Sequence, residues 1–212
     1  IYFVTNIQEK TSTVPVTFRT QNRSIEKWNP YNGVISVVVH FLPTENGIHI
    51  PLQLAPYESV FLVFSPGEPA EFITQTNLTE ISLAGKTGFM AKATANGDYF
   101  FTLRKDEKEE TKTLSVQGVP APFNISGNWK MELEGKQFPK IMRTTQVLSS
   151  WTDDETTRHL SGTGKYEIGF ELPAGYVNND MELLLDVGKV GQIAEVFVNG
   201  KLAGIVALPT DK

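Results

Sequence analysis

Hydrophobic and polar residues alternate most clearly between residues 161 and 204. In three short runs every second residue is apolar, which is the period-two pattern of a strand with one buried face. The third run ends at Asn199-Gly200, and this pair predicts a tight hairpin because both residues tolerate positive φ. We therefore expect this part of the chain to be built from β-strands. The alternating positions are Tyr166, Ile168, Phe170 and Leu172, then Met181, Leu183, Leu185 and Val187, then Ala194, Val196 and Val198.

The rest of the chain consists of similar short segments that are bounded by Gly, Pro or Asn. Short segments bounded by such turn-forming residues are typical of all-β proteins, and no segment carries a convincing helical pattern. We therefore predict an all-β fold. The first group of predicted strands covers residues 1–6, 15–20, 25–28, 34–41, 48–54 and 59–64, and the second covers residues 70–76, 80–83, 89–94, 99–104 and 111–116.

Two β-sandwich modules are predicted, with a linker at residues 118–122. Pro120 and Pro122 remove backbone donors that a central strand would need, so a strand is not expected there. We assign one module to residues 1–118 and the other to residues 119–212. A candidate internal boundary lies near residues 66–69, where a Ser-Pro-Gly-Glu-Pro run interrupts the strand pattern. Because the chain already reads as a strand from Ile1, we expect it to be a piece of a longer protein.

Composition narrows the classes of partner. The 212 residues carry a formal net charge of −5 and include no cysteine. Without a basic stripe, nucleic acid and anionic membrane surfaces are poor partners. No apolar run approaches the roughly 20 residues that a membrane-spanning helix needs. The missing cysteines exclude disulfides and thiolate sites within these residues.

No catalytic centre is predicted for this chain. Glycoside hydrolysis needs two carboxylates that face each other across a sugar. Asp153, Asp154 and Glu155 follow one another in a polar loop, and Glu195 alternates with apolar neighbours, so these residues are read as solvated surface. The three histidines have no partner at metal-ligand spacing, and we expect no metal site and no cofactor.

Aromatic side chains are the better candidates for ligand contact. Sugars present apolar C–H faces that match flat rings, and their hydroxyl groups need nearby carboxylate or amide partners. Trp151 lies in a loop beside Asp153 and Asp154, and Trp28 lies beside a turn. We take these four residues as candidate carbohydrate-binding residues. The alternative is that each tryptophan folds back and caps one end of a sandwich.

The order of several phrases along the chain resembles two modules of a glycoside hydrolase. The second module resembles the galactose-binding-like jelly roll of glycoside hydrolase families 2 and 106, and the first resembles the β-domain that follows the catalytic barrel in family 106. The phrases of the second module are GNW (127–129), LSSWTD (148–153), SGTGKY (161–166), FELP (170–173), LDVG (185–188) and AEVFVNG (194–200). Those of the first are YFVTN (2–6), EKWNPYNG (26–33) and LAPYESVF (54–61).

The resemblance implies a non-catalytic accessory region of a bacterial, α-L-rhamnosidase-like enzyme that is periplasmic or extracellular. Its partner would be an upstream catalytic barrel, which it would brace, and a glycan is a further candidate partner. Calcium belongs to that barrel in the family, and no motif here supports it. Ala207 replaces the aromatic residue of the family pattern, and the sequence stops before the further strands of that pattern. We therefore expect a jelly roll that is shorter than its relatives or completed by a neighbouring chain. A free-standing carbohydrate-binding module and a surface adhesin remain as alternatives.

Overall fold

The computed structural model describes residues 1–212 except 68, 86–87, 178–179 and 208–212. Over these residues it contains seventeen strands, one short 3-10 helix and no α-helix, so the predicted all-β class is confirmed. The chain divides into two compact units, residues 1–119 with 187–212 and residues 120–186. Each unit is described by itself. No helix among the described residues is long and apolar enough to cross a membrane.

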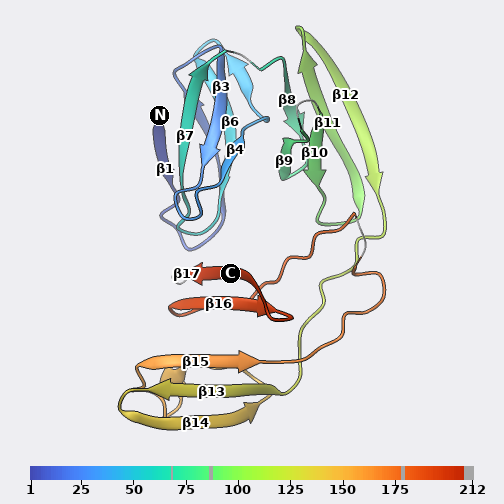
Figure 1. Cartoon of the computed structure of the whole chain (residues 1–212). Helices are drawn as coiled ribbons and strands as arrows, with labels where there is room; N and C mark the ends of the chain where they lie inside the picture. The colour runs from blue at the N-terminus through green and yellow to red at the C-terminus, as the bar shows by residue number, and fades with distance from the viewer. Residues whose placement is uncertain (68, 86–87, 178–179, 208–212) are drawn as a thin grey trace. The chain divides into compact units, whose positions relative to one another are not determined.

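The first unit begins with a sandwich of two antiparallel sheets (Figure 1). One sheet has the order β1-β7-β3-β4, and the other has the order β2-β6-β5. The strands of the first sheet are β1 (Tyr2–Thr5), β7 (Ser59–Pro66), β3 (Arg23–Trp28) and β4 (Ile35–Val37). Those of the second are β2 (Ser12–Phe18), β6 (Gly47–Leu54) and β5 (Leu42–Thr44).

The sandwich core is formed by the inward-facing residues of both sheets. Ile25 of β3 and Val60 and Leu62 of β7 are fully buried, and alternate residues of β6, including Ile48 and Ile50, are almost fully buried. Burial of one such aliphatic side chain contributes about 1.5–3 kcal/mol. The period-two pattern of the sequence is therefore the direct cause of the two-layer packing.

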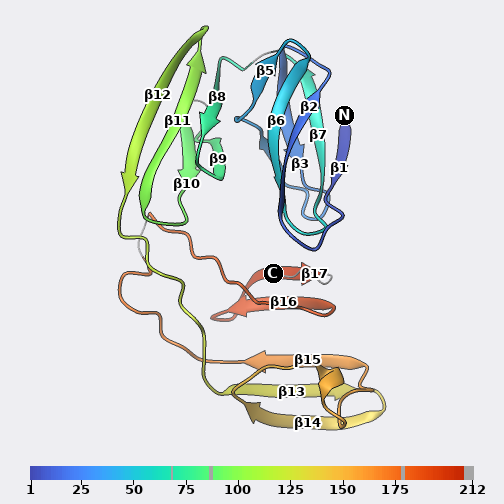
Figure 2. The ribbon, with the colours of Figure 1, turned by 180° about the vertical axis from the view of Figure 1, so that it is seen from behind.

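A second group of strands follows in the same unit (Figure 2). Its sheet has the order β12-β11-β8, and a separate hairpin pairs β10 with β9. His40 forms a parallel bridge with Ile73 of this group, and the rings of Phe41 and Phe72 stack with centroids 4.4 Å apart. The strands are β8 (Glu71–Thr76), β9 (Glu80–Leu83), β10 (Phe89–Lys92), β11 (Gly97–Lys105) and β12 (Lys108–Val116).

The predicted hairpin at Asn199-Gly200 is confirmed. It connects β16 (Ile193–Val198) to β17 (Lys201–Ala207), and the two turn residues have φ of 50° and 76°. Positive φ at both positions is the requirement of a type I′ turn, which glycine meets without steric cost. Glu195 is exposed while its neighbours Ala194 and Val196 are partly buried, as the alternation predicted.

The second unit contains a three-stranded antiparallel sheet with the order β14-β13-β15. Its strands are β13 (Trp129–Gly135), β14 (Phe138–Thr145) and β15 (Gly162–Glu167). The segment between β14 and β15 contains the 3-10 helix η1 (Trp151–Asp153). The sequence pattern did not reveal β14, whose Lys140 and Arg143 interrupt its apolar positions.

Two predicted alternating runs in this region differ from the structure: the run from Tyr166 to Leu172 stops being a strand after Glu167, and the run from Met181 to Val187 is not a strand. Residues 168–172 and 181–187 keep their alternating pattern but form no ladder with another strand in the described part of the chain. A strand exists only where a neighbour accepts and donates its backbone hydrogen bonds, so alternation alone does not create one. Leu184, in the second of these segments, is 95% exposed. The jelly-roll topology of the second module stays a prediction.

Candidate functional site

The candidate site of the second unit lies where the loop between β14 and β15 covers one face of the sheet. The strand register places Arg143 of β14 and Tyr166 of β15 on either side of Met131 in β13. Leu133, two residues further along β13, is fully buried on the same face. The loop supplies the tryptophan and the carboxylates that were predicted as site residues.

Trp151 folds back onto this face of the sheet. Its ring lies over Gly164, where an added Cβ would stand only 2.6 Å from the ring carbon Cζ2. Its indole Nε1 donates a hydrogen bond to the Tyr166 hydroxyl group. The absent side chain at Gly164 therefore creates the space for the indole, and the hydrogen bond fixes its orientation.

The backbone of the loop is held from within. The Ser150 hydroxyl oxygen accepts a hydrogen bond from the backbone N–H of Thr152 at the start of η1. Thr157 is 1% exposed, and its hydroxyl group donates to the carbonyl oxygen of Trp151 at 2.9 Å. Because a buried hydroxyl group is costly without a partner, this contact stabilises the turn that carries the tryptophan.

Both carboxylate oxygens of Asp154 accept hydrogen bonds from other residues of the chain. Its Oδ2 accepts a hydrogen bond from Arg143 Nη1 at 2.5 Å, and its Oδ1 accepts from both the hydroxyl group and the backbone N–H of Thr156 at 2.6 and 2.8 Å. The Thr156 hydroxyl group, followed by Arg143, lowers the pKa of Asp154 well below its usual range. A general acid needs a raised pKa, so this carboxylate is unsuited to that role.

Asp153 differs from its neighbour. It is exposed, and its backbone N–H donates to the carbonyl oxygen of Ser150. The structure therefore brings Trp151 and Asp154 into one packed cluster and leaves Asp153 on the solvent side of the same turn. Trp28, the fourth predicted residue, ends β3 in the other unit, where its Nε1 donates to Glu26 Oε2 at 2.9 Å.

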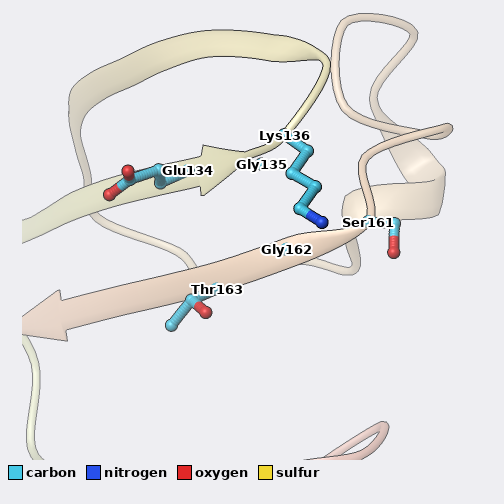
Figure 3. A pocket seen from close by; sticks show the side chains of 6 residues that line it. All are labelled: Glu134, Gly135, Lys136, Ser161, Gly162 and Thr163. Carbon is cyan, nitrogen blue, oxygen red and sulfur yellow. The ribbon is translucent and has the colours of Figure 1, made fainter.

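Two hollows lie on the second unit. The hollow beside Trp151 has a volume of about 60 Å³ and also touches Met131, Arg143 and Asp154. This volume is far below the ~300–1,000 Å³ of small-molecule sites. The other hollow, of about 340 Å³, is lined by Glu134, Gly135, Lys136, Ser161, Gly162 and Thr163, with Lys136 extending toward the start of β15 (Figure 3).

The larger hollow offers polar groups but no aromatic surface. Its lining carries one carboxylate, one ammonium group and two hydroxyl groups. These groups could hydrogen-bond a polar ligand at the protein surface, but they provide no flat ring for a sugar to stack on. It is therefore a weaker candidate for sugar contact than the tryptophans.

Metal-ligating residues do not gather in the described residues: no three His, Asp or Glu side chains lie close enough to hold an ion. His49 instead contacts the Thr17 hydroxyl group through Nδ1 at 3.1 Å. Burial lowers the pKa of His40, which favours its neutral form.

Sequence reasoning missed the residues that hold the cluster together. Arg143, Gly164 and Tyr166 come from two different strands, and only their register with β13 shows that they meet. Thr156 could have been found, because an aspartate two residues before a threonine in a polar loop favours a local Asx turn. The hydroxyl group of the same threonine is the contact that contributes most to the low pKa of Asp154.

Part of the chain is similar in sequence to a known protein. A protein named "Putative beta-glucuronidase" from Formosa agariphila is 33% identical over 107 residues. The match covers 47% of this chain and 9% of that protein. The matched part of the chain thus spans about a tenth of the length of this curated relative. No family model matches the chain.

Proposed function

We propose that this chain is a non-catalytic accessory region of a larger glycoside hydrolase. The observation that carries the proposal is the match of about half of the chain to 9% of a protein named as a β-glucuronidase. A catalytic domain with its substrate site would occupy a much larger share of such an enzyme. The all-β fold, with no α-helix in the described residues, fits an accessory module.

The finer assignment rests on the phrases that resemble family 106. In this proposal residues 1–118 form a β-sandwich domain and residues 119–212 form a galactose-binding-like jelly roll. The partner is a catalytic barrel upstream in the same polypeptide, which these domains brace. The enzyme is exported to the periplasm or the cell exterior. The proposal that this region is non-catalytic is supported by Asp154, whose carboxylate is hydrogen-bonded to Arg143 and Thr156.

Hydrolysis assays with this chain test the proposal. We expect no release of aryl groups from aryl β-glucuronides, α-L-rhamnosides or β-galactosides, with an active β-glucuronidase as the positive control in the same plate. The reading frame around the coding segment supplies the second test, because we expect a barrel with paired acidic residues upstream. Turnover that copurifies with the chain through a second column would overturn the proposal, as would a reading frame without a catalytic domain.

A further inference from the structure

The outer face of the sheet β1-β7-β3-β4 carries an aromatic row that no predicted site included as a whole. The register pairs Phe3 of β1 with Phe61 of β7, Phe61 with Trp28 of β3, and Trp28 with Ile35 of β4. Consecutive strands of one sheet thus present three aromatic residues and one isoleucine in line. The four strands can be followed in Figure 1.

This row faces away from the sandwich core. Ile25, Val60 and Leu62 are fully buried, and side chains alternate between the two faces of a strand. Phe61 and Trp28 therefore lie on the opposite face. Phe3 is 58% and Trp28 is 38% exposed, so these rings are open to solvent rather than enclosed.

The rings of the row are held in place. Phe3 and Phe61 lie in contact, with centroids 5.1 Å apart and planes tilted by 49°. The hydrogen bond from Trp28 Nε1 to Glu26 Oε2, at 2.9 Å, ties the indole to a carboxylate two residues earlier on the same face. A rigid sheet with pre-oriented rings loses little conformational entropy when a ligand binds.

Polar groups border the row on both sides. On one side, Ser59 Oγ donates to Thr5 Oγ1 at 2.9 Å, and both residues belong to the outer face. On the other side, Glu26 lies between Val63 and Val37 in the next line of residues. Hydroxyl groups therefore border the aromatic row on one side, and a carboxylate flanked by two valines borders it on the other.

We propose that this row binds an extended, uncharged glycan whose sugar rings stack on Phe3, Phe61 and Trp28. With strands about 4.8 Å apart, the three aromatic positions span about 10 Å, which suits consecutive sugar units better than a single one. Sugar hydroxyl groups at the edges would donate to Glu26 and contact the hydroxyl groups of Thr5 and Ser59. The Glu26 carboxylate and the net charge of −5 disfavour an acidic glycan.

The polar groups beside the row favour a glycan over a protein partner. A stable protein interface buries about 800 Å² on each side around a broad, poorly charged centre. The carboxylate beside the indole of Trp28 and the hydroxyl groups of Thr5 and Ser59 are a poor match for such a centre but can hydrogen-bond the hydroxyl groups of a sugar. The choice of a glycan as the ligand rests on the proposed carbohydrate-related function. The aromatic row itself is observed in the strand register and does not depend on that proposal.

Affinity electrophoresis of the full chain in gels containing a neutral β-glucan, arabinoxylan, galactomannan or polygalacturonate tests the inference. We expect at least one neutral polysaccharide to retard the protein and polygalacturonate to leave it unretarded. Trp28→Ala and Phe3→Ala should each weaken binding about tenfold, the usual scale for losing a central aromatic anchor. Phe197→Ala is the matched control, because Phe197 is 57% exposed on β16 and should not affect binding.

Glu26→Gln separates the role of charge from that of packing, because the amide oxygen still accepts the indole N–H. We expect this variant to keep its affinity for the neutral glycan. Thermal melting of each variant shows that the fold is intact. The inference is overturned if no neutral polysaccharide binds, if Phe197→Ala weakens binding as much as Trp28→Ala, or if sedimentation reveals a dimer that Trp28→Ala dissociates. If the chain binds no neutral polysaccharide and hydrolyses no aryl glycoside, only the glycan-binding inference is refuted. If it hydrolyses aryl glycosides, the proposed accessory role is refuted and the glycan-binding inference is not affected.

Discussion

At the scale of single residues, the carboxylate of Asp154 stabilises the fold through its hydrogen bonds to Arg143 and Thr156. Its folded pKa is lowered by the Thr156 hydroxyl group and by Arg143. A group with a lowered folded pKa contributes stability above its unfolded pKa, and that contribution is lost as the pH falls toward the folded value. We therefore predict that Asp154→Asn lowers the melting temperature at neutral pH, and that the difference from wild type shrinks progressively below about pH 4, the ordinary pKa of an aspartate.

Asp153→Asn provides the control for this prediction. Asp153 is exposed on the same turn, and no ion pair in the described part of the chain involves it. Its substitution should leave the melting temperature unchanged across the same pH series, since surface changes of this kind usually stay within about 0.5 kcal/mol. A constant difference between wild type and Asp154→Asn from pH 7 down to pH 2 would contradict the assignment of the ion pair.

At the scale of elements, β15 and the loop above it fit together through Gly164. An alanine there would place Cβ 2.6 Å from the Trp151 ring and 3.0 Å from a methyl carbon of Leu133. We predict that Gly164→Ala destabilises the second unit by about 1–3 kcal/mol, the usual cost of overpacking. Chemical denaturation followed by near-ultraviolet circular dichroism measures this loss, because Trp151 must move.

Gly169→Ala is the matched control in the same unit. A Cβ at Gly169 meets nothing within 4 Å, and its backbone does not require positive φ. This variant should therefore unfold at the same denaturant concentration as wild type. Equal destabilisation by both substitutions would show that glycine content, rather than the indole packing, controls this unit.

Alternation in the sequence was sufficient to predict elements whose partners lie nearby. β16 and its hairpin follow from one apolar pattern and one Asn-Gly pair, and the burial of Val60 and Leu62 follows from the period of β7. Residues 181–187 carry an equally good pattern yet form no strand, because pairing depends on a distant segment. The cluster around Trp151 was predicted only in part for the same reason: Arg143 reaches Asp154 through the register of β14 with β13.

At the scale of the whole molecule, the chain contains two compact units. Leu62 is fully buried in the sandwich core of the first unit, and the neighbours of Gly164 all belong to the second unit. Domains generally unfold as units. We predict two calorimetric components, of which Leu62→Ala lowers the first-unit component and Gly164→Ala lowers the other. Removal of a buried leucine costs about 2–5 kcal/mol, which is a large fraction of the stability of one domain.

The double variant makes this prediction sharper. If the two interiors are independent, Leu62→Ala and Gly164→Ala together should shift each component by the amount that each shifts alone, within about 0.5 kcal/mol. Leu184→Ala supplies the control, since Leu184 is 95% exposed and should shift neither component. A single component that both variants lower equally would show that the chain unfolds as one cooperative body. If the two units unfold independently, a substitution can unfold one of them and leave the other folded. This measurement therefore also decides whether the aromatic row can be tested apart from the cluster around Trp151.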